Sequence, residues 1–97
     1  MKEIDKKSVN NKIEIIDNLV KDAINSEDVS VAGTFLIEAH KELSELEMHT
    51  NDNKINEIYE EFLKLNKVIL NGYLHTYSRN FEKINSEYNE FNKLITQ

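Results

Sequence analysis

Apolar residues recur every three or four positions along almost the entire chain, which is the spacing of one face of an α-helix. In the second half they keep a single phase from Ile55 to Ile95, even across Asn71 and Gly72, where a helix would ordinarily end. Because a chain reversal gives the phase no reason to survive, we interpret residues 53–96 as one long helix. Two helices broken at Gly72 are the alternative.

The first half carries two apolar stripes that are rotated by roughly 120° from one another on a helical projection. One extends from Val9 to Ile24 and the other from Val31 to Leu46. Cap-type and acidic residues typical of a helix start lie between them. We therefore predict helices over residues 8–25 and 28–49 with a break near 25–28, and the alternative is one helix whose stripe winds around its axis.

The polar run from His49 to Asn53 predicts a turn near the middle of the chain. The chain has no proline and only two glycines, a composition that favours helix. The predicted fold is all-α, with residues 1–97 in a single domain. It is an antiparallel helical hairpin or a small helical bundle with a long C-terminal helix.

The apolar stripe on residues 55–95 covers about half of the helix circumference, more than one neighbouring helix can bury. It is either the core of a monomeric bundle or, in part, a face that binds another protein or a second copy of the chain. For a partner-binding face, the candidate contacts are the large rings of the stripe: Tyr59, Phe62, Tyr73, Tyr77 and Phe81.

Acidic residues are concentrated in the middle of the chain. The net charge of the chain is −6, and residues 27–61 hold ten acids against two bases, a net charge of −8. Such a surface repels phosphate, which argues against nucleic-acid binding, and it attracts basic proteins. The candidate acidic contacts are Glu42, Glu45, Glu57, Glu60 and Glu61. A solvated face without a partner is the alternative.

The residues needed for catalysis or metal binding do not form a recognisable pattern. The chain has no cysteine, two isolated glycines cannot form a phosphate-binding loop, and no Glu-x-x-His pair is present. We expect the three histidines (His40, His49 and His75) at the surface and the carboxylates facing solvent. We predict a non-enzymatic protein with no catalytic residue, cofactor or bound metal.

No apolar run approaches the roughly 18 residues that a membrane span requires. The first twelve residues are too polar for a signal peptide. We expect a cytoplasmic protein, or one that is secreted without a cleaved signal peptide.

The segment from Asn51 to Tyr59 resembles the midpoint of the WXG (Esx)-type small secreted helical hairpins in spacing and in the aromatic at Tyr59. The Trp-x-Gly turn and the small residue of that family are absent. So is its export signal, because Tyr88 is followed four residues later by Asn92 rather than by an acid. The resemblance lies in the architecture over most of the chain, and it implies a helical partner of a toxin of type VII secretion.

A second class of protein fits the charge rather than the apolar stripe. Small immunity proteins, antitoxins and phage anti-defence proteins are often acidic helical bundles that cap a basic target. The sequence therefore predicts a protein-binding module, and it leaves open whether the module is a co-secreted partner or an acidic inhibitor.

Overall fold

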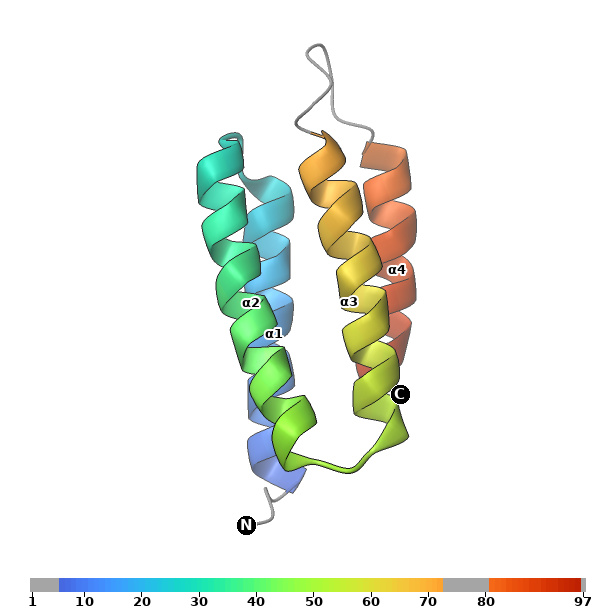
Figure 1. Ribbon diagram of the computed structural model, residues 1–97. Helices are drawn as coiled ribbons and strands as arrows, with labels where there is room; N and C mark the ends of the chain where they lie inside the picture. The colour runs from blue at the N-terminus through green and yellow to red at the C-terminus, as the bar shows by residue number, and fades with distance from the viewer. Residues whose placement is uncertain (1–5, 73–80, 97) are drawn as a thin grey trace.

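The described residues of the protein form four α-helices (Figure 1). The computed structural model describes residues 6–72 and 81–96. Successive helices run in opposite directions and lie side by side, so the start of the first and the end of the last are at the same end of the molecule. The described part of the chain contains no strand. The helices are α1 (Lys6–Asn25), α2 (Val29–His49), α3 (Asn53–Gly72) and α4 (Phe81–Thr96).

The helices α2 and α3 begin where polar residues of the sequence predicted helix starts. Asp28 is the N-cap of α2, and its carboxylate accepts a hydrogen bond from the backbone N–H of Ser30 at 2.7 Å. Asp52 does the same before α3, accepting from the N–H of Lys54 at 2.9 Å. These bonds satisfy N–H groups that a helix start leaves without partners. The predicted breaks near 25–28 and after His49 are confirmed.

The core takes residues from all four helices. On α1 it uses the predicted stripe, with Ile16 and Val20 almost fully buried. The rings of Phe62 and Phe91 meet between α3 and α4, with centroids 6.4 Å apart. The fully enclosed residues (under 2% exposed) with the largest side chains are Phe62, Phe91, Ile16, Leu43, Leu46, Ile58, Leu65, Ile69, Ile84 and Val20.

The single helix predicted over residues 53–96 is wrong. The helix α3 ends at Gly72, α4 begins at Phe81, and the two pack against each other. The helical phase of the apolar residues is nevertheless the same before and after the break. The core residues Ile69 and Ile84 are fifteen positions apart, which is close to a whole number of helical turns (four). A rod would have left the apolar stripe in water, whereas two antiparallel helices bury it on α1 and α2.

Polar contacts between helices complete the bundle. The Tyr88 hydroxyl on α4 donates a hydrogen bond to Asp17 of α1 at 2.7 Å, and Lys21 lies 3.1 Å from the other oxygen of that carboxylate. Partial burial, together with the bond to Asp17, raises the pKa of Tyr88 well above its ordinary value. The contact joins the first helix to the last and closes the four-helix arrangement.

Adjacent residues on α3 provide a test of this core. Phe62 is fully buried, whereas the next residue, Leu63, is 41% exposed. We expect Phe62→Ala to lower the free energy of unfolding by about 3–5 kcal/mol, because it removes a buried ring and leaves a cavity. Leu63→Ala should lower it by less than about 1 kcal/mol. Urea denaturation of both variants measures the difference, and equal losses would contradict this packing.

Candidate functional site

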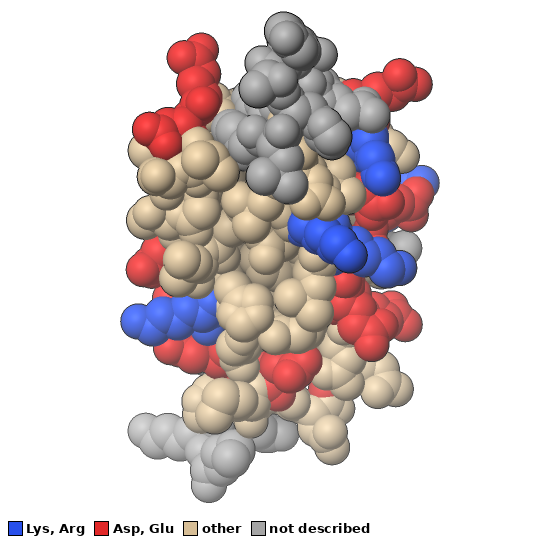
Figure 2. All heavy atoms as spheres, turned by 45° about the horizontal axis from the view of Figure 1, so that its top comes forward, with Lys and Arg blue, Asp and Glu red and all other residues tan. Residues whose placement is uncertain are grey.

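A hollow of about 220 Å³ lies between α2 and α3. None of the residues that line it carries a carboxylate, an ammonium or a guanidinium group. Figure 2 shows a broad area without charged residues over this part of the molecule. The lining residues are Gly33, Leu36, Ile37, His40, Asn66 and Leu70.

Helical spacing places these residues on facing flanks of the two helices. On α2, Gly33, Ile37 and His40 follow one another at intervals of four and three residues, so they share one side of that helix. On α3, Asn66 and Leu70 are four residues apart and share the side that faces α2. Leu36, which also lines the hollow, is a core residue and forms its inner wall.

Gly33 is an unfavourable residue at its position. It lies inside α2, where glycine costs about 1 kcal/mol relative to alanine. Its backbone does not have a positive φ, and apart from the adjoining residues and backbone of α2 itself, no heavy atom lies within 4 Å of the place where a Cβ would be. Neither the backbone conformation nor the packing among the described residues therefore requires glycine here.

Two further unfavourable features border the same hollow. Ile37 leaves 69% of its surface in solvent, more than most of the large apolar residues of the described chain. The side-chain oxygen of Asn66 is buried and has no hydrogen-bond partner among the described residues. A buried acceptor without a donor costs about 1–3 kcal/mol. The hollow thus combines an exposed apolar side chain, an unsatisfied acceptor and a glycine.

His40 forms part of the wall and has both ring nitrogens engaged. Its Nε2 shares a hydrogen bond of 2.9 Å with the Tyr59 hydroxyl of α3, and its Nδ1 lies 3.4 Å from the Ser44 hydroxyl. His40 is half-buried, contrary to the prediction of a surface residue, because it bridges the two helices. His49 is exposed as predicted, and His75 lies outside the described residues.

The structure describes the side chains of two of the five predicted apolar contacts, Tyr59 and Phe62. Phe62 is fully buried, so the prediction that its ring meets a partner does not fit its place in the core. Tyr59 is half-buried, and its hydroxyl is engaged by His40. Tyr73 and Tyr77 lie outside the described residues, as does the side chain of Phe81.

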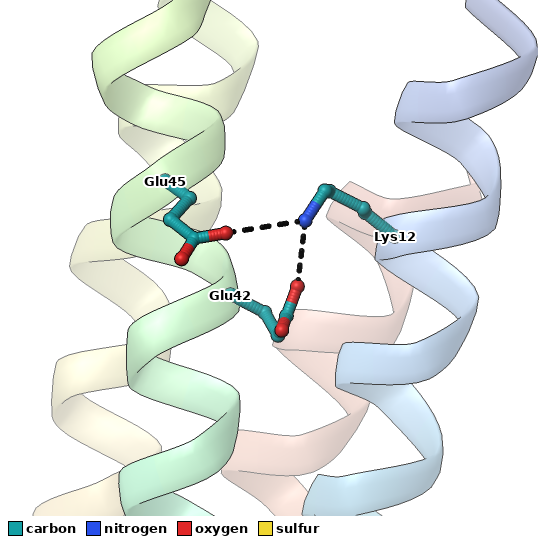
Figure 3. Close-up of polar contacts among 3 residues, drawn as sticks. All are labelled: Lys12, Glu42 and Glu45. Atoms are coloured by element: carbon teal, nitrogen blue, oxygen red, sulfur yellow. Dashed lines mark hydrogen bonds and ion pairs between the residues drawn. The ribbon is translucent and has the colours of Figure 1, made fainter.

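The five predicted acidic contacts are also dispersed. Lys12 of α1 reaches Glu42 at 2.7 Å and Glu45 at 3.3 Å (Figure 3). The hydrogen bond with Glu42 raises the pKa of Lys12 above its ordinary value. These two carboxylates therefore join α1 to α2 and are partly neutralised. Glu57 and Glu60, in contrast, are exposed on α3.

Glu61 contradicts the prediction that the carboxylates face solvent. The residue is 9% exposed, lies on α3 and forms a hydrogen bond with Glu87 of α4. Burial is the largest cause that raises its pKa, to about 7, and the bond and charge of Glu87 add to it. Lys64, 3.9 Å away, acts in the opposite direction. Glu61 is therefore a buried, partly protonated residue and does not offer its charge to a partner.

Other kinds of site do not emerge from residues 6–72 and 81–96. Within these ranges, no three His, Asp or Glu side chains converge in a way that could hold a metal ion. No helix in the same ranges combines the length and the apolar character that crossing a bilayer demands. Comparison of the chain with protein-family models, curated proteins and solved structures found no significant match in any of the three.

Sequence reasoning missed the hollow because, of the residues that line it, only Leu70 belongs to a predicted apolar stripe. The adjacent pair Leu36 and Ile37 was the available signal, since two neighbouring apolar residues on a helix cannot both face the same core. Gly33 in the middle of a helical stretch was the second signal. Nothing in the sequence indicated that Asn66 would lie opposite them.

Replacing Gly33 should test whether the bundle itself needs glycine. We expect Gly33→Ala to raise the free energy of unfolding by about 0.5–1 kcal/mol, because alanine favours helix and its methyl group meets open space. Thermal denaturation followed by circular dichroism measures the change. A destabilised variant would show that the glycine serves the packing of the monomer.

The stability of the protein should depend on pH through Glu61. Its pKa is higher in the folded state than in the unfolded chain, so its contribution is fully present below about pH 4.5 and is lost as the pH rises through about 7. Relative to wild type, Glu61→Gln should gain on the order of 2 kcal/mol between pH 5 and pH 8. Urea denaturation at both pH values measures this gain. The exposed neighbour serves as control, and an equal gain in Glu60→Gln would contradict the assignment.

Proposed function

We propose that the protein is a non-enzymatic binding module whose α2–α3 face receives another protein. One observation carries the proposal: Gly33, Ile37 and the unpartnered oxygen of Asn66 border the same hollow. Each is unfavourable in the isolated chain. Local rules of folding are usually broken where a protein meets something else.

A bound protein would relieve all three costs at once. It would cover the side chain of Ile37 and remove apolar surface from water. It would supply the hydrogen-bond donor that Asn66 lacks. It could also approach the backbone closely at Gly33, where no side chain intervenes. If side chains of the monomer relieved these costs instead, they would cover the hollow, and no surface would remain there for a partner.

Of the two partner classes, an acidic inhibitor or antitoxin-like protein is the better supported. The secretion-partner hypothesis relied on a broad apolar stripe that a two-helix hairpin leaves open. In the described residues, the bundle buries much of that stripe between its own helices, including Ile58, Phe62 and Phe91. The acidic character of the chain does not depend on the fold, and Glu57 and Glu60 remain exposed on α3. We therefore favour a basic target protein as the partner.

Two exposed isoleucines allow a matched test. Ile37 borders the hollow, whereas Ile15 is exposed on α1 at 49%. A photo-activatable amino acid at position 37, but not at position 15, should cross-link a protein in the cells that naturally produce this chain. Ile37→Glu should then weaken binding of that purified protein by about tenfold or more, because a charge replaces a desolvated apolar contact. Ile15→Glu should bind as wild type does.

Circular dichroism of both variants shows whether they remain folded, which is expected because both positions are exposed. Cross-linking from position 15 alone, or equal binding by the two glutamate variants, would show that the α2–α3 face is not the binding surface.

A further inference from the structure

The α2–α3 face has the features of a surface that pairs with a second copy of itself. We infer that two copies of the chain associate through this face about a two-fold axis, so that α2 packs antiparallel on the α2 of the second copy, and α3 antiparallel on its α3. This association is additional to the proposed function and does not rest on it. It gives the face an occupant that a bound target would displace.

Exposed apolar side chains gather on this face. Ile37 and Met48 of α2 are exposed and eleven positions apart, close to three helical turns, so they lie on the same side of the helix. Leu63 of α3 is exposed and lies about two turns before Leu70, which lines the hollow. Three of the six large apolar residues that are exposed in the described chain therefore share one face. A second copy would remove all three from water.

The charges of this face suit an acidic chain that meets its own copy. The net charge is −6, so two copies repel one another wherever their acidic surfaces face each other. No carboxylate lines the hollow, and an exposed lysine flanks it on each helix. Lys41 comes four residues after Ile37, and Lys67 comes four residues after Leu63. These lysines give the acidic residues of a second copy a place to bind.

Glu60 and Lys67 form a self-complementary pair on α3. Helical register turns Glu60 away from the hollow and into one row with Lys67, because the two are seven residues, or about two turns, apart. Both are exposed, and among the described residues neither takes part in an ion pair. In an antiparallel pair of α3 helices, a two-fold axis midway between them places Glu60 of each copy opposite Lys67 of the other.

The same axis brings opposite charges together on α2. Ile37 and Asn66 line the same hollow on antiparallel helices, so each step forward along α2 is level with a step backward along α3. The middle of the charged row on α3 is therefore level with a point between Glu38 and Lys41 of α2, which are both exposed. Two pairs of opposite charge thus agree on one axis. A second copy accounts for this agreement, whereas an unrelated protein gives no reason for it.

The size of the face sets the strength of the association. The helices α2 and α3 have 21 and 20 residues, so each is about 30 Å long. Packed helices lie about 10 Å apart, which gives the face an area of about 600 Å². Stable complexes bury about 800 Å² on each partner. We therefore expect a dimer that dissociates at micromolar concentrations and that a tightly bound target displaces.

Sedimentation equilibrium of the full chain at micromolar concentrations tests the association. Wild type should show a monomer–dimer equilibrium. Ile37→Glu should raise the dissociation constant about tenfold or more, because it places a charge in the apolar contact. Ile15→Glu, at an exposed position on α1, should associate as wild type does. A wild-type chain that stays monomeric throughout, or equal effects of the two variants, overturns the inference.

Charge reversal tests the two-fold axis. Lys67→Glu and Glu60→Lys should each raise the dissociation constant about threefold or more, since either change puts like charges opposite one another twice in the dimer. The double variant Lys67→Glu, Glu60→Lys should associate as wild type does. A mixture of the two single variants should form heterodimers. Circular dichroism should show all variants folded, because both positions are exposed. A double variant that associates no better than the single ones overturns the inference.

A cysteine next to the axis gives a direct readout. The chain has no cysteine of its own, so Leu63→Cys introduces the only thiol. Because Leu63 lies close to the midpoint of the charged row on α3, the thiols of the two copies should meet and form a disulfide-linked dimer under mild oxidation. Ile15→Cys should remain monomeric under the same conditions. Equal dimer formation by both variants contradicts the proposed axis.

The proposed function and this association fail separately. If the chain is monomeric in sedimentation but position 37 cross-links a different protein, the association is wrong and the proposed function stands. If the dimer forms with the expected charge rescue but position 37 cross-links a second copy alone, the association stands and the proposed function fails.

Discussion

The burial of one broad apolar surface determines this structure. The second half of the chain carries large apolar residues over about half of a helical circumference, and a single neighbouring helix cannot cover so much. Dividing the segment into α3 and α4 and folding them against each other turns both apolar sides toward α1 and α2. Phe62 and Phe91 then meet in the centre of the bundle. The separation of α3 from α4 and the contact between Tyr88 and Asp17 follow from this arrangement.

Local sequence signals predicted most of the helix boundaries. The separation of α3 from α4 depends instead on contacts between distant parts of the chain. Asp28 and Asp52 mark helix starts through bonds to backbone groups two residues away, so the sequence alone reveals them. The division of α3 from α4 leaves no comparable mark in the phase, because Ile69 and Ile84 agree whether or not the helix continues between them. Whether this segment forms one continuous helix or two antiparallel helices depends on how much apolar surface the entire chain can bury. The periodicity of apolar residues does not measure that burial.

The candidate binding surfaces were less predictable, for a related reason. Counting charges located the acidic middle of the chain but not the partners of each carboxylate. Lys12 comes from thirty positions earlier to reach Glu42, and Glu61 faces Glu87 on the next helix. Likewise, the large rings were expected at a partner because they are large, yet Phe62 is large because it fills the centre of the bundle. Exposure in a helical bundle depends on which helices are neighbours, and that is settled only by the tertiary fold.

The α2–α3 face differs from the rest of the bundle because it holds residues that lower stability without contributing to the core. Gly33 and Ile37 could be replaced by alanine and by a polar residue without disturbing a buried side chain, since one meets open space and the other is largely in solvent. A chain shaped only by its own stability would gain from both changes. Asn66 adds a third cost at the same place, where an apolar residue would leave no acceptor unsatisfied. Three independent costs that meet at one hollow are hard to explain by folding, and the proposed bound protein would offset all of them.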